Sequence, residues 1–251
     1  MSKMTDRIST SAAAEQARKH YENEQRSKLP SIIVTLASGG KIYPKDHILT
    51  SGKIEMRYMT AYDEDIITNL SYIREGVMLD RLIESISLTK FDIQEMSTFD
   101  KDGLLIAARI LSYGSEYPVV VQDPKTKKDL TRIVNLNNIH PKPFRLIADK
   151  NGEFEYTAGD TKFKFTYNVD DIADLIPSTF CKTVITEVDG SRSKEIIDHF
   201  IRYKFMAKDA KQFRMYYSDN APGIDMTTEF EGEDGGTFSA GFSIKSDFFW
   251  F

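Results

Sequence analysis

The sequence contains little of what builds disulfides and metal centres. Its 251 residues include one cysteine, Cys181, and four histidines. A single cysteine cannot form a disulfide within the chain, and it offers no cysteine cluster to a structural metal. The histidines are scattered without the spacing of metal ligands: His20, His47, His140 and His199. We therefore expect a reducing compartment, no metal and no cofactor.

Long apolar runs and an excess of positive charge are also absent. No apolar run approaches the roughly 18–20 residues of a membrane-spanning helix. The N-terminal residues MSKMTDRIST lack the apolar core of a secretory signal. The net charge is −5 and the isoelectric point is about 5.5, whereas a general nucleic-acid-binding protein is usually basic. We expect neither a membrane span nor a nucleic-acid partner.

No group of residues has the pattern of a catalytic site. Ser38-Gly39-Gly40-Lys41 lacks the Gly-x-x-x-x-Gly-Lys-Ser/Thr spacing of a phosphate loop. Asp63, Glu64 and Asp65 are adjacent, so on a helix they point in different directions and suit a helix N-terminus better than a metal. We predict no catalytic residue. An enzyme with an unrecognised site is the alternative class, which a deep pocket with convergent carboxylates or a histidine would favour.

Residues 31–67 have the clearest alternation of strands and turns. Three short runs predict strands: Ser31–Leu36, Lys41–Leu49 and Lys53–Tyr58. Gly39-Gly40 and Ser51-Gly52 supply the conformational freedom that tight turns between them need. Thr60 then suits a helix N-cap and is followed by acidic residues that suit a first helical turn. The stretch predicts a strand, turn, strand and helix.

Helices and hairpins follow in both halves of the chain. The predicted helices are Arg74–Ser87, one from Ser97 to about Gly114, Asp170–Leu175, one that Ser191 caps, and Asp209–Tyr217. The predicted hairpins are Tyr117–Gln122 with Leu130–Leu136, around a turn that begins with Asp-Pro, and Met226–Glu231 with Thr237–Ile244. Further strands are predicted at Phe144–Ala148, Glu153–Tyr156 and Lys162–Val169.

This pattern predicts an α+β fold with short antiparallel hairpins and small helical groups. Residues 1–30 form a polar helical arm, which is either solvent-exposed or docked on a neighbouring subunit. The stiff segment His140-Pro141-Lys142-Pro143 separates an N-terminal domain, 31–140, from a C-terminal domain, 141–251. Each domain contains a helix followed by a hairpin, which indicates a weak internal duplication.

Several motifs resemble the baseplate hub proteins of T-even-type contractile-tailed bacteriophages. They are Ser38-Gly39-Gly40 with Tyr43-Pro44, Glu55 and Arg57, Thr60 before Asp63-Glu64-Asp65-Ile66, Pro222-Gly223-Ile224-Asp225 and Phe248-Phe249-Trp250. The sequence departs from the family at Ala37, where a proline is expected, and in hairpin turns that lack a Cys-x-x-Cys zinc knuckle. If the resemblance holds, the hairpins are kept without the metal.

The resemblance implies a non-enzymatic tail protein. It would be a baseplate hub component or a chaperone-like factor that assists hub assembly. It would act in the host cytoplasm during tail assembly, and the sequence leaves open whether it stays in the finished virion. Its partners would be other hub proteins or the tape-measure protein, and a homo-oligomer is one option. The alternative becomes a phage-encoded enzyme such as a hydrolase.

The chain ends in consecutive aromatic residues, Phe248, Phe249, Trp250 and Phe251. These side chains either fold back into the core or insert into a partner, where buried aromatic side chains contribute strongly to binding. The last 33 residues carry seven acids and one lysine, a net charge of −6 (1 − 7). Such a charge favours a basic protein partner.

Overall fold

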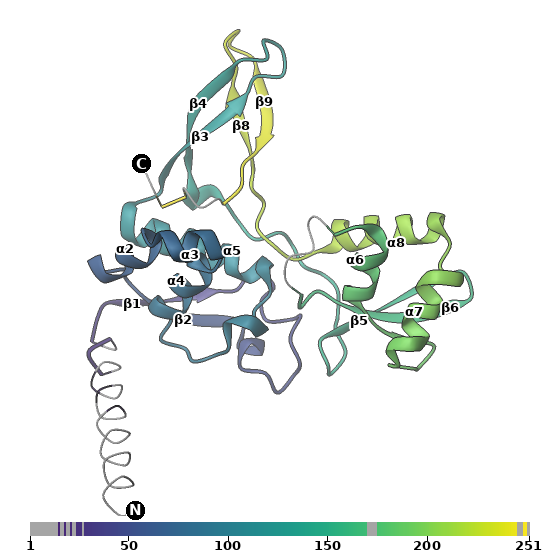
Figure 1. Cartoon of the computed structure of the whole chain (residues 1–251). Helices are drawn as coiled ribbons and strands as arrows, with labels where there is room; N and C mark the ends of the chain where they lie inside the picture. The colour runs from purple at the N-terminus through teal and green to yellow at the C-terminus, as the bar shows by residue number, and fades with distance from the viewer. Residues whose placement is uncertain are drawn as a thin grey trace, which may run out of the picture.

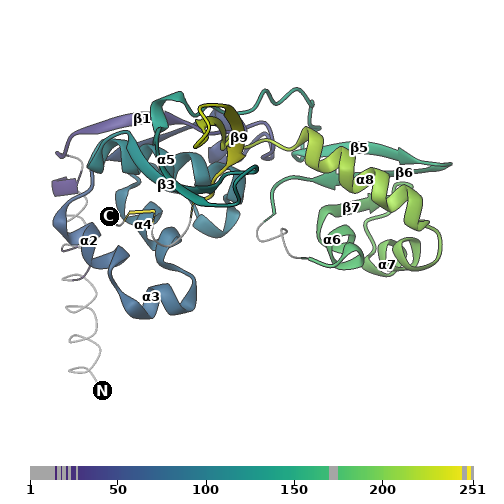
Figure 2. The ribbon, with the colours of Figure 1, turned by 90° about the horizontal axis from the view of Figure 1, so that it is seen from above.

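The structure, a computed structural model, describes residues 15, 18, 21, 24–26, 28–169, 175–244 and 248–249. Figure 1 shows helices and small antiparallel sheets gathered in two bodies, with a pair of β-hairpins that projects away from the first body. The view from above in Figure 2 shows the second body beside the first. The fold is mixed α+β, as the sequence predicts. No helix among the described residues is long and apolar enough to cross a membrane.

The first body packs a small sheet against a layer of helices. Strand β1 (Ser31–Thr35) pairs antiparallel with β2 (Lys53–Arg57), and the side chains of Ile54 and Met56 on β2 are fully buried. The helical elements are α2 (Ala61–Ile67), α3 (Leu70–Glu75), α4 (Met78–Ile86), the 3₁₀ turn η2 (Ile93–Glu95) and α5 (Thr98–Tyr113). The predicted start of α2 is confirmed, because Thr60 is its N-cap and donates its backbone N–H to Asp63 Oδ2 at 2.7 Å.

Two predictions for this body are wrong. The predicted strand Lys41–Leu49 is a series of turns followed by the 3₁₀ helix η1 (Ile48–Ser51). The loop closes tightly on itself, and a Cβ at Gly40 would lie 2.6 Å from the Thr50 carbonyl oxygen. The predicted helix Arg74–Ser87 is divided between α3 and α4, because Gly76 ends α3 in the left-handed conformation at φ 72°.

A buried carboxylate connects this loop to α5. The carboxylate of Asp100 accepts hydrogen bonds from the backbone N–H and the hydroxyl of Ser38 and from the Tyr43 hydroxyl, each at 2.7 Å. Burial raises the pKa of Asp100 despite these bonds. The hydroxyl of Ser97, next to this cluster, donates to the carbonyl of Tyr167 in the second body at 3.1 Å. Because the Ser97 N–H also donates to the Tyr43 hydroxyl at 3.1 Å, Ser97 connects the loop that carries the Ser-Gly-Gly and Tyr-Pro motifs to the second body.

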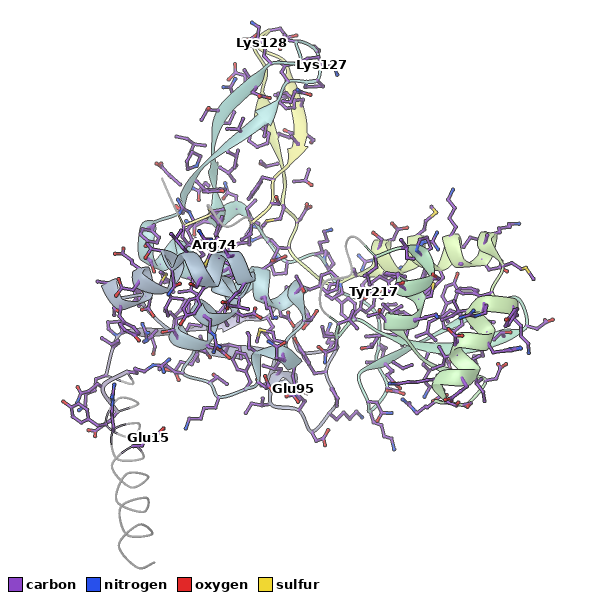
Figure 3. The ribbon with its side chains drawn as sticks, in the orientation of Figure 1. Glu15, Arg74, Glu95, Lys127, Lys128 and Tyr217 are labelled. Carbon is purple, nitrogen blue, oxygen red and sulfur yellow. The ribbon has the colours of Figure 1, made fainter. Side chains whose placement is uncertain are left out.

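The second body is built around aromatic side chains. Strands β5 (Glu153–Ala158), β6 (Thr161–Thr166) and β7 (Ile185–Val188) form its antiparallel sheet. Helices α6 (Pro177–Val184), α7 (Lys194–Tyr203) and α8 (Ala207–Asn220) cover it. The predicted burial of Phe163, Phe165 and Tyr167 is confirmed, because each is at most 1% exposed, but β6 ends at Thr166 and not at the predicted Val169. They pack on Phe213 and Tyr217 of α8, the latter labelled in Figure 3.

Several local predictions for the second body need correction. Residues 144–148 alternate between more buried and exposed positions but belong to no strand. Helix α6 and strand β7 were not predicted, because Pro177 occupies the first turn of a helix instead of ending one. Helix α7 begins after Ser193, two residues further along than a cap at Ser191 predicts. The predicted helix Asp170–Leu175 falls mostly on 170–174, which lie outside the described residues.

The chain returns to the first body after α8. Strands β3 (Glu116–Gln122) and β4 (Asp129–Asn135) form the first projecting hairpin, and β8 (Thr227–Glu231) and β9 (Thr237–Gly241) form the second. The predicted boundary near His140–Pro143 lies on the crossing between the bodies. There Lys142 N donates to the Gly223 carbonyl at 2.8 Å, so the outgoing and returning segments run together. Of the N-terminal arm, Glu15, Arg18, Tyr21 and residues 24–26 are described as helical.

Candidate partner-binding site

The candidate site is the pair of hairpins β3–β4 and β8–β9, which we call the paired hairpins. They come from distant parts of the sequence and project together from the first body in Figure 1. In β3 every second residue is buried: Tyr117, Val119 and Val121. Phe230 of β8 is also buried and lies 6.1 Å from Phe238 of β9, centroid to centroid. The alternation creates one apolar face on each hairpin, and the two faces cover each other.

The two hairpin tips are joined by hydrogen bonds and ion pairs. Figure 3 places Lys127 and Lys128 at the far end of the paired hairpins. Lys125 and Lys128 form ion pairs with Asp234 and Glu233 of the other turn, at 2.7 and 3.0 Å. These pairs are exposed, so each contributes little stability by itself, and they fix the alignment of the tips.

A buried carboxylate holds the two turns together. Asp123 accepts hydrogen bonds from the backbone N–H groups of Thr126 and Lys125 in its own turn, and from that of Glu233 in the other turn at 3.2 Å. These bonds, with the Thr126 bond first among them, hold the pKa of Asp123 below its usual range. A Cβ at Gly232 would lie 3.0 Å from Asp123 Oδ2, so the close approach favours glycine there.

The base of the paired hairpins is closed by the C-terminal aromatic residues. Phe248 and Phe249 are 0% and 2% exposed. The Phe248 ring packs against Tyr117 of β3 at a centroid distance of 4.8 Å, and Phe249 contacts Tyr113 of α5 at 6.4 Å. Arg109 of α5 is fully buried and donates from Nη1 to the Phe248 carbonyl at 2.7 Å. The end of the chain therefore ties the hairpins to α5.

Arg109 reaches this position between aromatic rings. Its guanidinium lies 4.8 Å from the Tyr117 ring centroid and 5.4 Å from that of Phe248. Burial lowers the pKa of Arg109, while the electron-rich ring faces favour the cation. Sequence patterns gave no sign of this arginine, since Arg109 follows two alanines in a helix with no acidic partner at helical spacing.

The outward face of the first hairpin carries exposed apolar side chains. Val120 and Ile133 are 69% and 67% exposed, and Pro118 lies opposite Ile133 in the register. We call these three residues the outer patch. Pro118 has no backbone N–H to offer at the open edge of β3, which disfavours unspecific strand pairing there. An apolar group on a projecting hairpin is typical of a surface that a partner covers.

The predicted partner-binding residues fall into two groups. Phe248 and Phe249 occupy internal positions, the first of the two alternatives that the sequence leaves open. Trp250 and Phe251 lie outside the described residues. The outer patch and the joined tips were missed, although the opposite charges of the two predicted turns, three lysines in one and two acids in the other, were visible in the sequence.

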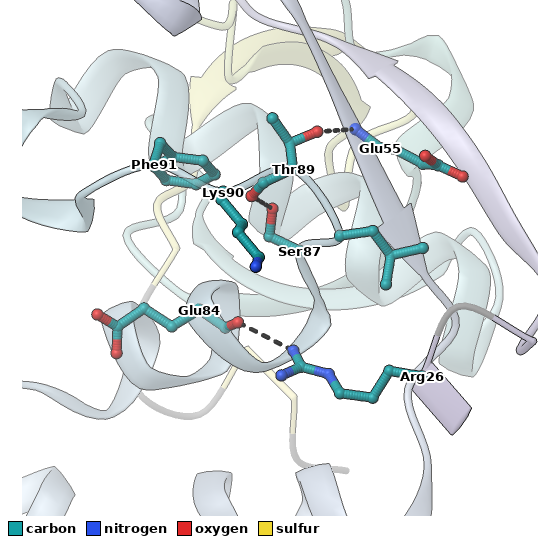
Figure 4. Close-up of a pocket in the computed structure, with 8 residues that line it drawn as sticks. Arg26, Glu55, Glu84, Ser87, Thr89, Lys90 and Phe91 are labelled. Atoms are coloured by element: carbon teal, nitrogen blue, oxygen red, sulfur yellow. Dashed lines mark hydrogen bonds between the residues drawn. The ribbon is translucent and has the colours of Figure 1, made fainter. Parts of the chain in front are cut away.

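A separate hollow lies beside the N-terminal arm, shown in Figure 4. Its volume is about 500 Å³, and Arg26, Glu55, Glu84 and Lys90 line it with mixed charge. Arg26 donates hydrogen bonds to the carbonyls of Glu84 and Ser85. These carbonyls lie at the C-terminal end of α4, where the helix dipole favours a positively charged side chain. These contacts anchor the end of the arm. Among the described residues, no group of three or more histidine, cysteine, aspartate or glutamate side chains is placed to hold a metal ion.

Comparison with known proteins identifies the family. The family model described as "T4 bacteriophage base plate protein" matches residues 29–250. No curated protein and no solved structure matches the chain. The match runs from the start of β1 through the second body and the paired hairpins to the aromatic end. The chain therefore belongs to the family of T4 bacteriophage base plate proteins.

Proposed function

We propose that this protein serves the baseplate hub, as a hub component or as a factor that assists hub assembly, and that it works by binding other baseplate proteins. The observation that carries the proposal is the outer patch on a projecting, internally braced pair of hairpins. The bracing at the tip and base holds the patch in one shape before a partner arrives, which lowers the entropic cost of binding.

A binding role without catalysis fits the way the chain uses its buried charges. Asp63, Asp100 and Asp123 are each buried in networks of hydrogen bonds to their own chain. Such carboxylates hold loops and turns in place and leave little capacity for proton transfer to a substrate. In contrast, burial of the exposed apolar side chains of Val120 and Ile133 by a partner would stabilise the complex.

Deleting the gene from the phage is expected to reduce the number of complete baseplates at least about tenfold, because one missing hub contact interrupts an ordered assembly. The measurement is a count of baseplates in infected-cell lysates by sedimentation and electron microscopy. Supplying the intact protein in trans is the control and should restore the count. A normal count without the protein would refute a role in the baseplate hub.

Quantitative mass spectrometry of purified tails and of lysates then separates the two forms of the proposal. A fixed copy number in tails identifies a hub component. Abundance in the lysate with absence from tails identifies an assembly factor that leaves after its work.

A further inference from the structure

Residues 144–148 have the properties of a strand without a partner strand. The side chains of Phe144, Leu146 and Ala148 pack against the core, while those of Arg145 and Ile147 point outward. Ile147 is 92% exposed. This alternation is the period of a strand with one buried face, and the composition also favours a strand.

The backbone of this segment is free to pair. Within the described part of the chain, the N–H and C=O groups of 145–148 make no hydrogen bond. The two flanking residues are hydrogen-bonded. Lys41 Nζ donates to the Phe144 carbonyl at 3.2 Å, and Asp149 N donates to the Glu153 carbonyl at 2.8 Å. A row of open backbone groups in an extended segment is a template for an added strand.

A positively charged slot lies along this segment. A hollow of about 330 Å³ is lined by residues 145–149 and by Gly40, Lys41, Tyr43, Lys45 and Thr50. Its lining includes three bases, Lys41, Lys45 and Arg145, and one acid, Asp149, which is held by Lys164 at 3.0 Å. The charge of the slot favours an acidic segment, and the exposed Ile147 favours an apolar side chain beside it.

We propose that residues 145–148 bind an extended segment of a partner protein as an added β-strand, and that one face of that segment carries an acidic residue and, two positions along, an apolar residue. Backbone hydrogen bonds to 145–148 hold the segment. Its acidic side chain faces Lys45 and Arg145, and its apolar side chain packs on Ile147. This surface shares no residue with the paired hairpins, so it adds a second binding site and does not depend on the hub proposal.

Hydrogen–deuterium exchange of the full chain tests the proposal directly. The probe is the capped seven-residue peptide Thr-Glu-Thr-Val-Thr-Glu-Thr, which places Glu and Val on the same face of a strand. It is expected to slow the exchange of every second amide within 145–148 at least about tenfold, because successive N–H groups of a strand point to opposite edges and the added strand bonds those on one edge. Two control peptides should give no protection: one has Lys in place of each Glu, and the other carries N-methyl groups on alternate residues so that it cannot pair as a strand.

Charge reversal supplies the second readout. K45E/R145E should abolish protection by the Glu peptide and permit protection by the Lys peptide. The matched control, K204E/K208E, changes exposed lysines of the second body by the same charge and should behave as wild type. No protection by the Glu peptide, or equal protection by both charged peptides, would overturn the proposal. So would protection without peptide that grows with protein concentration, since it would indicate a second copy of the chain.

Discussion

Replacing Asp63 by asparagine is expected to lower the free energy of unfolding by about 3–5 kcal/mol, because it leaves a buried arginine without its counter-charge. Arg57 and Asp63 are 4% and 0% exposed, and they form two parallel hydrogen bonds of 2.7 and 2.8 Å. The Ser85 hydroxyl adds a third bond to Asp63 at 2.7 Å, so the pair joins β2, α2 and α4. Urea unfolding at pH 7 measures the loss. The control, Asp65→Asn, changes an exposed acid of the same helix and should cost little.

The stabilisation by Asp63 should depend on pH with a defined sign. Burial alone would raise the pKa of Asp63, but the bonds from Arg57, Ser85 and Thr60 and the charge of Arg57 lower it to about 2. A carboxyl group whose pKa is lowered by folding stabilises the protein above its unfolded value, 3.8, and loses this effect as the pH falls toward 2. The difference between wild type and Asp63→Asn should therefore shrink below about pH 4. A constant difference down to pH 2 would contradict this account of the pair.

Replacing Phe248 by alanine is expected to lower the free energy of unfolding by about 3–5 kcal/mol, the usual cost of emptying a buried aromatic site. The ring fills the space between Tyr117 and Arg109 and is 0% exposed. Removing residues 248–251 should cost at least as much and should loosen the base of the paired hairpins. Thermal or urea unfolding measures both changes.

The matched control for Phe248 is Tyr62→Ala, which removes an aromatic side chain that is 71% exposed. Its effect should stay within about 0.5 kcal/mol. If Phe248→Ala unfolds like the control, the aromatic end does not brace the hairpins, and its role as a partner anchor becomes the better interpretation.

Local signals predicted the elements that depend on neighbouring residues. Thr60 begins α2 because cap and acid lie three residues apart, and the turn that begins with Asp123-Pro124 places β3 against β4. The strand prediction for Lys41–Leu49 failed because close backbone contacts at Gly40 closed that stretch into turns. Propensity describes a single stretch of chain, whereas these contacts depend on which segments meet.

The parts that were not predicted depend on long-range pairing. Alternation along β2 placed Arg57 among the outward residues, yet Asp63 and α4 cover it. The buried partners of Asp100 lie more than fifty positions away in sequence, at Ser38 and Tyr43. Residues 144–148 have the sequence of a strand, and no strand in the described part of the chain pairs with them. The outer patch could not be predicted, because it depends on two distant hairpins covering each other's inner faces.

The most direct test of the account is whether the outer patch is needed to build baseplates. V120K/I133K should keep the fold, because both side chains are exposed, and should reduce the count of complete baseplates at least about tenfold when it replaces the wild-type protein in infected cells. The matched control, I33K/Y62K, places the same charges at exposed apolar positions of the first body, 67% and 71% exposed, and should support assembly. A normal baseplate count with folded V120K/I133K would contradict the central claim that the paired hairpins bind a baseplate partner.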